Sequence, residues 1–273
     1  MSQKHLWIAV FLASVVAAFG CRSALTEPPP AAEIGGVGGP GKTGAGDANA
    51  MVVRAGAEFG KRPDRAAVER ARTLYLEAVK TADAPVEAFL GAARATAWLV
   101  ENEEDGQRRE ELAVEGVQIG QHCVRLFQSV PECTYRLALA VGQQARELPS
   151  TAADGLDVMV ELLSEVIAVA PQLDFGGGDR VMALVLLRAP GWPAGPGDPE
   201  TALIHAENAT ASFPDYPPNL LVLAEAFLAN NRREEARSSY EAASNRAAER
   251  REIGEPEAAG WLADAEAALA EIR

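Results

Sequence analysis

From about residue 48 to the end of the sequence, apolar residues recur every three or four positions, a spacing typical of amphipathic helices. Signals for helix starts are Pro63-Asp64, Thr151 to Asp154, Asp198-Pro199 and Pro217-Pro218. Signals for helix ends are Asp83, Pro131, Pro149, Pro171 and Pro214. The pattern predicts about ten helices, each of roughly 12 to 20 residues and arranged in pairs, with no strand.

An internal repeat runs through this helical part. Residues 202–209 overlay residues 236–243 at an offset of 34 residues. The clearest copy, 217–250, places Phe227 on its first helix and Tyr240 on its second, with alanines at the positions where the helices approach. This period and spacing resemble the tetratricopeptide repeat (TPR). The sequence therefore predicts an all-α, TPR-like superhelix, with an irregular helical bundle as the alternative.

More degenerate copies precede this repeat, and one helix follows it. The expected segments are 49–82, 84–129, 131–170 and 178–214, with a capping helix at 256–272. The prediction is thus four to five helix pairs and a C-terminal cap, all within residues 48–273.

The first 20 residues have the features of an export signal. Lys4 is the only charged residue among them, and an uncharged apolar run from Leu6 to Phe19 follows it. This run is shorter than the about 20 residues that a transmembrane helix needs. Ala18 to Cys21 resembles a bacterial lipobox, so residues 1–20 are predicted to be a lipoprotein signal peptide and Cys21 the acylated residue. Ordinary cleavage after a nearby alanine is the alternative.

Residues 21–47 combine the predicted lipidated cysteine with a stretch rich in proline and glycine, which predicts a flexible tether. Residues 36–43 match the P-loop pattern G-x-x-x-x-G-K-[ST]. A P-loop needs a strand before it and a helix after it, but the prolines at 28–30 disfavour the strand, and Gly44 and Gly46 disfavour the helix. We therefore interpret the match as part of the tether and expect no cofactor.

Charge and motif content exclude several functions. The formal net charge is −14, and removal of the signal with Lys4 makes it −15, so the chain lacks the basic footprint that nucleic-acid binding requires. His122 and His205 have no partner at a metal-binding spacing, and no G-x-S-x-G motif is present. We expect neither a metal site nor an enzyme, and Glu103 to Asp105 is interpreted as a solvated acidic loop.

Two cysteines remain if Cys21 is acylated. Cys123 and Cys133 flank a predicted turn at Pro131. In an oxidising compartment they either form a disulfide across that turn or stay as two buried thiols.

The least regular part of the helical domain, residues 172–199, carries a second resemblance. Its features occur in a fixed order: a glycine run before an Arg-bearing helix, the loop Ala189-Pro190-Gly191-Trp192, a helix opened by Gly197-Asp198-Pro199, and Phe213 to Asn219 leading into Leu223-Ala224-Glu225. Over residues 131–243 this order resembles the TRAP-transporter-associated T component (TatT) family, which consists of periplasm-facing lipoproteins with cryptic TPRs.

The resemblance implies an accessory scaffold of tripartite ATP-independent periplasmic (TRAP) transporters. Such a scaffold docks the periplasmic substrate-binding P component and assembles as a homo-oligomeric ring with a central opening. The residue that follows Cys21 is Arg22 and not the aspartate that retains lipoproteins at the inner membrane. The expected location is therefore the outer membrane, facing the periplasm.

Binding residues are predicted from the repeat architecture, because the first helix of each pair lines the concave face of a TPR array. This places Arg180, Asn219 and Glu225 on the binding face, and the irregular segment adds Arg188 and Trp192. Each has a structural alternative: the arginines would satisfy loop carbonyls, Trp192 would pack its loop onto the helices, and Asn219 would cap a helix.

Together these features predict a lipid-anchored, periplasm-facing TPR scaffold that binds a protein partner. Two alternatives keep the same repeats. One is an envelope or outer-membrane assembly lipoprotein, and the other is an oligomeric pore or carrier for apolar small molecules.

Overall fold

The computed structural model describes residues 45–272, which form eleven α-helices and one short 3-10 helix. In chain order they are α2 (Ala45–Phe59), α3 (Arg65–Val79), α4 (Val86–Glu101), α5 (Gly106–Leu126), α6 (Pro131–Glu147), η2 (Pro149–Thr151), α7 (Ala152–Val169), α8 (Gly177–Arg188), α9 (Pro199–Ser212), α10 (Pro217–Ala229), α11 (Arg233–Glu252) and α12 (Ala258–Glu271). Residues 45–272 contain no strand. None of the helices in this range is long and apolar enough to cross a bilayer.

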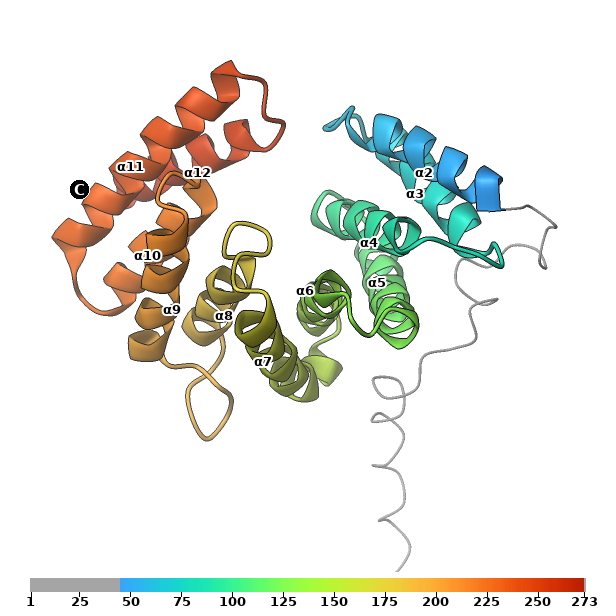
Figure 1. Cartoon of the computed structure of the whole chain (residues 1–273). Coiled ribbons are helices and arrows are strands. Elements are labelled where there is room, and N and C mark those ends of the chain that lie inside the picture. The colour runs from blue at the N-terminus through green and yellow to red at the C-terminus, as the bar shows by residue number, and fades with distance from the viewer. Residues whose placement is uncertain (1–44, 273) are drawn as a thin grey trace, which may run out of the picture.

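The helices pack in five consecutive pairs followed by a cap. The pairs are α2/α3, α4/α5, α6/α7, α8/α9 and α10/α11, and α12 packs on α11. Figure 1 shows the pairs following one another along a curved array, with α4, α6, α8 and α10 on its inner side. The predicted all-α, TPR-like superhelix with a C-terminal cap is confirmed.

Small residues allow the helices of neighbouring pairs to approach closely. Ala71, Tyr75 and Ala78 of α3, two small side chains on either side of a large one, are buried. Gly91 of α4 faces Tyr75 so closely that a Cβ there would lie 2.2 Å from the Tyr75 ring. The pair Gly91 and Tyr75 therefore fixes how the second helix pair sits on the first.

The inner helices do not form an unbroken row. The inner helices α4 and α6 pack on each other, as do α8 and α10, whereas α6 and α8 have no comparable packing. The loop between α7 and α8 lies at this position on the inner side of the array (Figure 1). The contacts that bridge this break are described below.

The two ends of the array meet. Arg62, in the loop between α2 and α3, donates from Nε to a carboxylate oxygen of Glu257, next to α12, over 2.8 Å. The same guanidinium donates to the carbonyl oxygen of Phe59 and lies 3.9 Å from the centroid of its ring. In Figure 1 the α2–α3 and α11–α12 loops approach each other at the top, so the array closes into a ring-like shape.

The start of α2 corrects one expectation. The glycines near residue 45 were expected to disfavour a helix, but α2 begins at Ala45 and includes Gly46. Its residues Ala48 and Ala55 are fully buried, and this packing outweighs the cost of a glycine in the first turn. The P-loop match at 36–43, the predicted signal at 1–20, Cys21 and most of the predicted tether lie outside the described residues.

Cys123 and Cys133 are bonded in the structure. Their sulfur atoms lie 2.04 Å apart and their Cα atoms 5.3 Å apart. The bridge joins the last turn of α5 to the first turn of α6, within a cluster that includes Phe89 and Val79. Of the two arrangements that the sequence left open, the structure contains the disulfide.

Candidate binding surface

A buried polar network crosses the break between the inner helices α6 and α8. Its members are Tyr135 of α6, Asp174 of the α7–α8 loop, Arg180 of α8 and Asn219 of α10, called here the Arg180 network. The Arg180 guanidinium donates to the Asp174 carboxylate over 2.6 Å and to Asn219 Oδ1 over 3.1 Å. The Tyr135 hydroxyl donates to the same carboxylate over 2.7 Å. These contacts join inner helices from three helix pairs.

Burial raises the pKa of Tyr135, so its hydroxyl stays protonated and remains a donor at physiological pH. Arg180 is also buried and supplies the positive charge that balances Asp174. An ionised pair of this kind is retained where further hydrogen bonds satisfy its remaining atoms. Tyr135 and Asn219 provide those bonds.

Asn219 is fully buried and holds three segments together. Its amide nitrogen donates to the carbonyl oxygens of Phe175 and Ala209, each over 3.0 Å. The N-cap position of α10 is occupied by Tyr216, whereas the Asn219 amide donates to a carbonyl in the last turn of α9, so Asn219 caps the C-terminal end of α9, as the structural alternative expected. Its side chain ties the α7–α8 loop to α9 and α10.

The α7–α8 loop has positive φ angles at the residues that the Arg180 network contacts. Asp174 and Phe175 have φ angles of 50° and 55°, and Gly176 follows with 77°. Left-handed conformations at non-glycine residues cost about 1 to 3 kcal/mol each and persist only where the surroundings fix them. Arg180 fixes this turn by donating to the carbonyl oxygens of both Asp174 and Phe175.

This turn presents Phe175 to a group of aromatic side chains. Phe175, which is 47% exposed, stacks on Tyr216 with a centroid separation of 4.6 Å. Tyr216 meets Trp261 of α12 edge to face at 5.6 Å, and Phe213 meets Phe175 at the same distance. We call these four residues the aromatic cluster. They bring together side chains from the α7–α8 loop, the α9–α10 loop and α12.

Two guanidinium groups lie beside the aromatic cluster. Arg180 lies 5.2 Å and Arg250 5.3 Å from the centroid of Tyr216. Aromatic and arginine side chains are enriched at protein–protein interfaces, where they carry much of the binding energy. The surface offers π-faces and the guanidinium edge of the partly exposed Arg250, so its chemistry suits recognition of a polypeptide segment.

The predicted binding residues fall into three places. Arg180 and Asn219 belong to the buried network, and both donate to the backbone carbonyl of Phe175, a member of the aromatic cluster. Arg188 and Glu225 pair with each other at 3.0 Å across α8 and α10, at a more exposed position. Trp192 is 90% exposed on the α8–α9 loop, so it does not pack that loop onto the helices. A binding role for these five residues stays a prediction.

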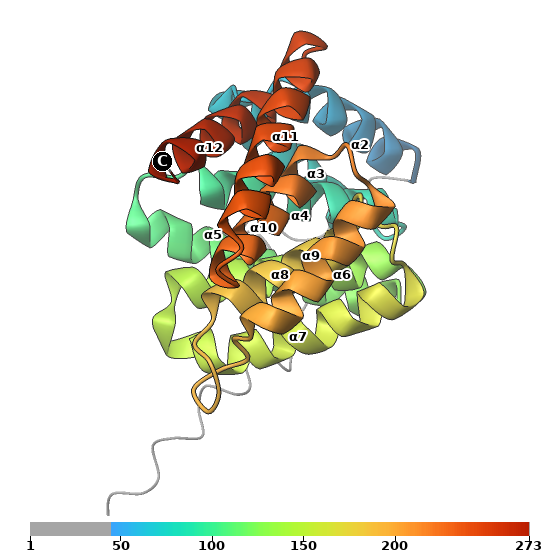
Figure 2. The ribbon, with the colours of Figure 1, turned by 90° about the vertical axis from the view of Figure 1, so that its left-hand side faces the viewer.

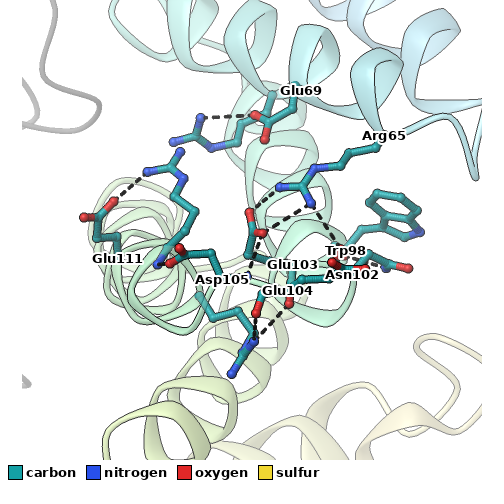
Figure 3. Close-up of polar contacts among 11 residues, drawn as sticks. Arg65, Glu69, Trp98, Asn102, Glu103, Glu104, Asp105 and Glu111 are labelled. Atoms are coloured by element: carbon teal, nitrogen blue, oxygen red, sulfur yellow. Dashed lines mark hydrogen bonds and ion pairs between the residues drawn. The ribbon is translucent and has the colours of Figure 1, made fainter.

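A second polar site lies between α4 and α5, where the sequence indicated a solvated acidic loop. Figure 3 shows the Glu103 carboxylate facing the Arg65 guanidinium of α3, with which it forms an ion pair. Glu103 also accepts from the Asp105 backbone N–H over 3.0 Å, and its side chain is only 8% exposed. The bond from Arg65, followed by that backbone bond, lowers the pKa of Glu103 to about 2. The expectation was therefore wrong for Glu103, because its partner lies far away in the sequence.

The histidines take part in structural contacts. His205 of α9 lies 2.7 Å from a carboxylate oxygen of Asp179 in the first turn of α8, and His122 contacts the carbonyl oxygen of Gln118. Within residues 45–272 no group of three or more His, Cys, Asp or Glu side chains is placed to hold a metal ion.

The tetratricopeptide repeat family profile matches residues 194–255, which include α9, α10 and α11. Residues 194–255 therefore contain a tetratricopeptide repeat. The structure of a thermophilic TPR protein from Thermus thermophilus aligns with a TM-score of 0.57 over 80% of this chain and 98% of that one, at 19% identity. That likeness shows a shared TPR-type fold. No curated protein sequence matches the chain.

The sequence indicated the inner face of the TPR array but missed Phe175 and Trp261. Phe175 precedes the glycine run at 176–178, and Trp261 lies in the capping helix. Neither belongs to the repeat pattern, and they are 86 positions apart in the printed sequence. Phe213 and Tyr216 were part of the FPDYPPN segment that carried the TatT resemblance, which was the one available signal.

Proposed function

We propose that the protein is a lipid-anchored, periplasm-facing scaffold whose aromatic cluster binds a protein partner. TPR arrays point generally to protein partners, and proteins with this fold are typically scaffolds rather than enzymes. The observation that carries the proposal is the half-exposed Phe175 on a strained turn that the Arg180 network holds in place. A surface fixed in this way loses little conformational entropy when a partner binds.

Within this class, we propose the role of the T component of a TRAP transporter, with the periplasmic substrate-binding P component as partner. The order of motifs over residues 131–243 supports this role. The Cys123–Cys133 disulfide supports an oxidising compartment such as the periplasm. The apolar run ending at Cys21 supports lipid anchoring, and Arg22 supports the outer membrane.

The partner is tested by placing a photo-crosslinking amino acid at position 175 in the full chain and irradiating living cells. Mass spectrometry of the crosslinked species should identify a periplasmic TRAP substrate-binding protein. A crosslinker at Leu126, an exposed apolar residue at the end of α5, is the matched control and should not capture it. Capture of outer-membrane assembly components at position 175 would contradict the TRAP role and favour the assembly alternative.

The anchor is tested separately by metabolic labelling with palmitate. The wild-type chain should incorporate label and sediment with membranes, and Cys21→Ser should do neither, because Cys21 is the predicted acylated residue. Equal labelling of the two forms would contradict the lipoprotein assignment. Recovery of lipid from inside the purified protein would instead favour the carrier alternative.

A further inference from the structure

The loop between α8 and α9, residues 189–198, projects away from the helical body (Figures 1 and 2). It carries Trp192, the most exposed large apolar side chain in residues 45–272, at 90% exposure. This loop lies apart from the inner face that carries the aromatic cluster. Protein binding at that cluster therefore leaves Trp192 without a role.

The loop is braced by its own backbone. The Gly197 N–H donates to the Pro190 carbonyl over 2.9 Å, and the Asp198 N–H donates to the carbonyl of Leu186 in α8, also over 2.9 Å. At Gly197 a Cβ would lie 2.2 Å from the Ala189 carbonyl oxygen, so the closed loop requires glycine there. The exposed indole is thus held on a preformed loop, which reduces the entropy lost on docking.

The loop carries no charge although the chain as a whole is strongly acidic. Residues 189–197 contain no charged side chain in a chain of formal net charge −14. The flanking charges are engaged, since Arg188 pairs with Glu225 and the Asp198 carboxylate accepts from the N–H groups of the first turn of α9. The loop therefore presents an indole, three prolines and small residues, without a group that would carry a large desolvation penalty.

We propose that this loop inserts Trp192 into the interfacial region of a lipid bilayer. The indole has an apolar body and one N–H donor, which is the combination favoured at the headgroup level of membranes. A bilayer fits better than a pocket on a partner protein because the loop has no charged side chain that would fix its orientation on such a partner. The proposal rests on the proposed lipid anchor at Cys21.

The anchor brings the loop within reach of the membrane. Residues 22–44 span at most about 80 Å when fully extended, so the anchored domain stays close to the bilayer. One inserted tryptophan alone binds weakly, but a tethered loop encounters the membrane at a high effective concentration. The anchor and Trp192 together would hold the TPR array in one orientation and keep its aromatic cluster accessible.

The test uses residues 21–273 without acylation, which is the chain that remains after removal of the predicted signal at 1–20. With Cys123 and Cys133 bridged, Cys21 is the remaining thiol and couples to a maleimide lipid in phosphatidylcholine vesicles. Acyl-chain bromines quench only tryptophans that enter the bilayer. We expect brominated vesicles to remove the share of emission that Trp192 contributes, leaving that of Trp98 and Trp261. Trp192→Phe should lose this quenching, and the matched control Trp261→Phe should keep it.

Quenching that is absent in the wild type, or equal in the wild type and Trp192→Phe, would overturn the proposal and assign Trp192 to a protein contact. Because the coupling is chemical, the result does not depend on acylation in cells. A failure of Cys21 acylation in cells would contradict the proposed anchor, whereas the vesicle measurement reports only whether Trp192 enters a bilayer, so the two failures can be told apart.

Discussion

At the scale of single residues, the structure separates side chains that support the candidate surface from those that form it. Arg180 and Asn219 were predicted from their positions on inner helices, and the structure buries both. Their hydrogen bonds hold the turn at Asp174 and Phe175, which places an aromatic ring on the surface. A periodic pattern can assign a residue to a helix face, but it cannot show that a side chain turns inward to meet a loop 44 positions away.

Replacing Asn219 with alanine should destabilise the protein strongly. The change removes the two hydrogen bonds that the Asn219 amide donates to the carbonyls of Phe175 and Ala209 and the one that it accepts from Arg180, and the loss of buried hydrogen bonds costs about 1 to 3 kcal/mol. We expect the free energy of unfolding to fall by about 2 to 4 kcal/mol in urea titrations. Asn245→Ala, at an exposed site on α11, is the control and should stay within about 0.5 kcal/mol of wild type. Similar losses in both variants would contradict the network.

The ion pair with Arg65 should give the Glu103 carboxyl a lowered pKa that can be measured by acid titration. Because the folded pKa of Glu103 is lowered to about 2, its stabilising effect is complete above its ordinary pKa and is lost as the pH falls through about 2. Arg65→Met should raise that pKa toward the ordinary glutamate range, as followed by carboxyl carbon NMR. Arg251→Met, on α11, is the control and should leave it unchanged. A Glu103 pKa that is the same with and without Arg65 would show that the pair does not form.

At the scale of helices, most of the architecture could be predicted from the sequence. The predicted repeat at 217–250 coincides with α10 and α11, and the predicted cap at 256–272 contains α12. Local signals were sufficient there, because proline, aspartate and periodic apolar residues act within one turn. The start of α2 and the turn at Asp174 to Gly176 were not predictable, since both depend on packing against distant segments.

The close contact between α3 and α4 predicts that a side chain at Gly91 would destabilise the protein. Gly91→Ala should lower the free energy of unfolding by about 1 to 3 kcal/mol, because the new methyl group would collide with the Tyr75 ring. Gly260→Ala is the matched control on α12, where a Cβ meets nothing within 4 Å. It should stabilise the protein by about 0.4 to 1 kcal/mol. Chemical denaturation of both variants measures the difference, and an unchanged stability for Gly91→Ala would contradict the packing.

At the scale of the whole molecule, the array closes on itself through Arg62 and Glu257, which lie 195 positions apart. The sequence pattern predicted a superhelix, but it could not show whether the ends of that superhelix meet. Curvature accumulates from small rotations between successive repeats, and those rotations depend on side-chain packing. The break between α6 and α8, bridged by the Arg180 network, is one point where this curvature is set.

Reversing the charge of Arg62 should open the array. Arg62→Glu places two carboxylates together, so the distance between spin labels in the α2–α3 and α11–α12 loops should increase and broaden in pulsed dipolar spectroscopy. The double variant Arg62→Glu/Glu257→Arg should restore the short distance. Glu58→Arg is the control, since Glu58 pairs with Lys61 and Arg70 instead. Identical distances in Arg62→Glu and wild type would show that the ion pair does not hold the ends together.

The central claim is that the aromatic cluster binds a protein partner, and the most direct test is an affinity measurement. The dissociation constant of the purified protein for the TRAP substrate-binding protein of the same cell should rise at least about tenfold in Phe175→Ala, because a buried aromatic anchor contributes more than about 1.4 kcal/mol. Leu126→Ala, which removes an exposed apolar side chain elsewhere, should leave the constant unchanged. The absence of binding by the wild type, or equal affinity of wild type and Phe175→Ala, would contradict the account.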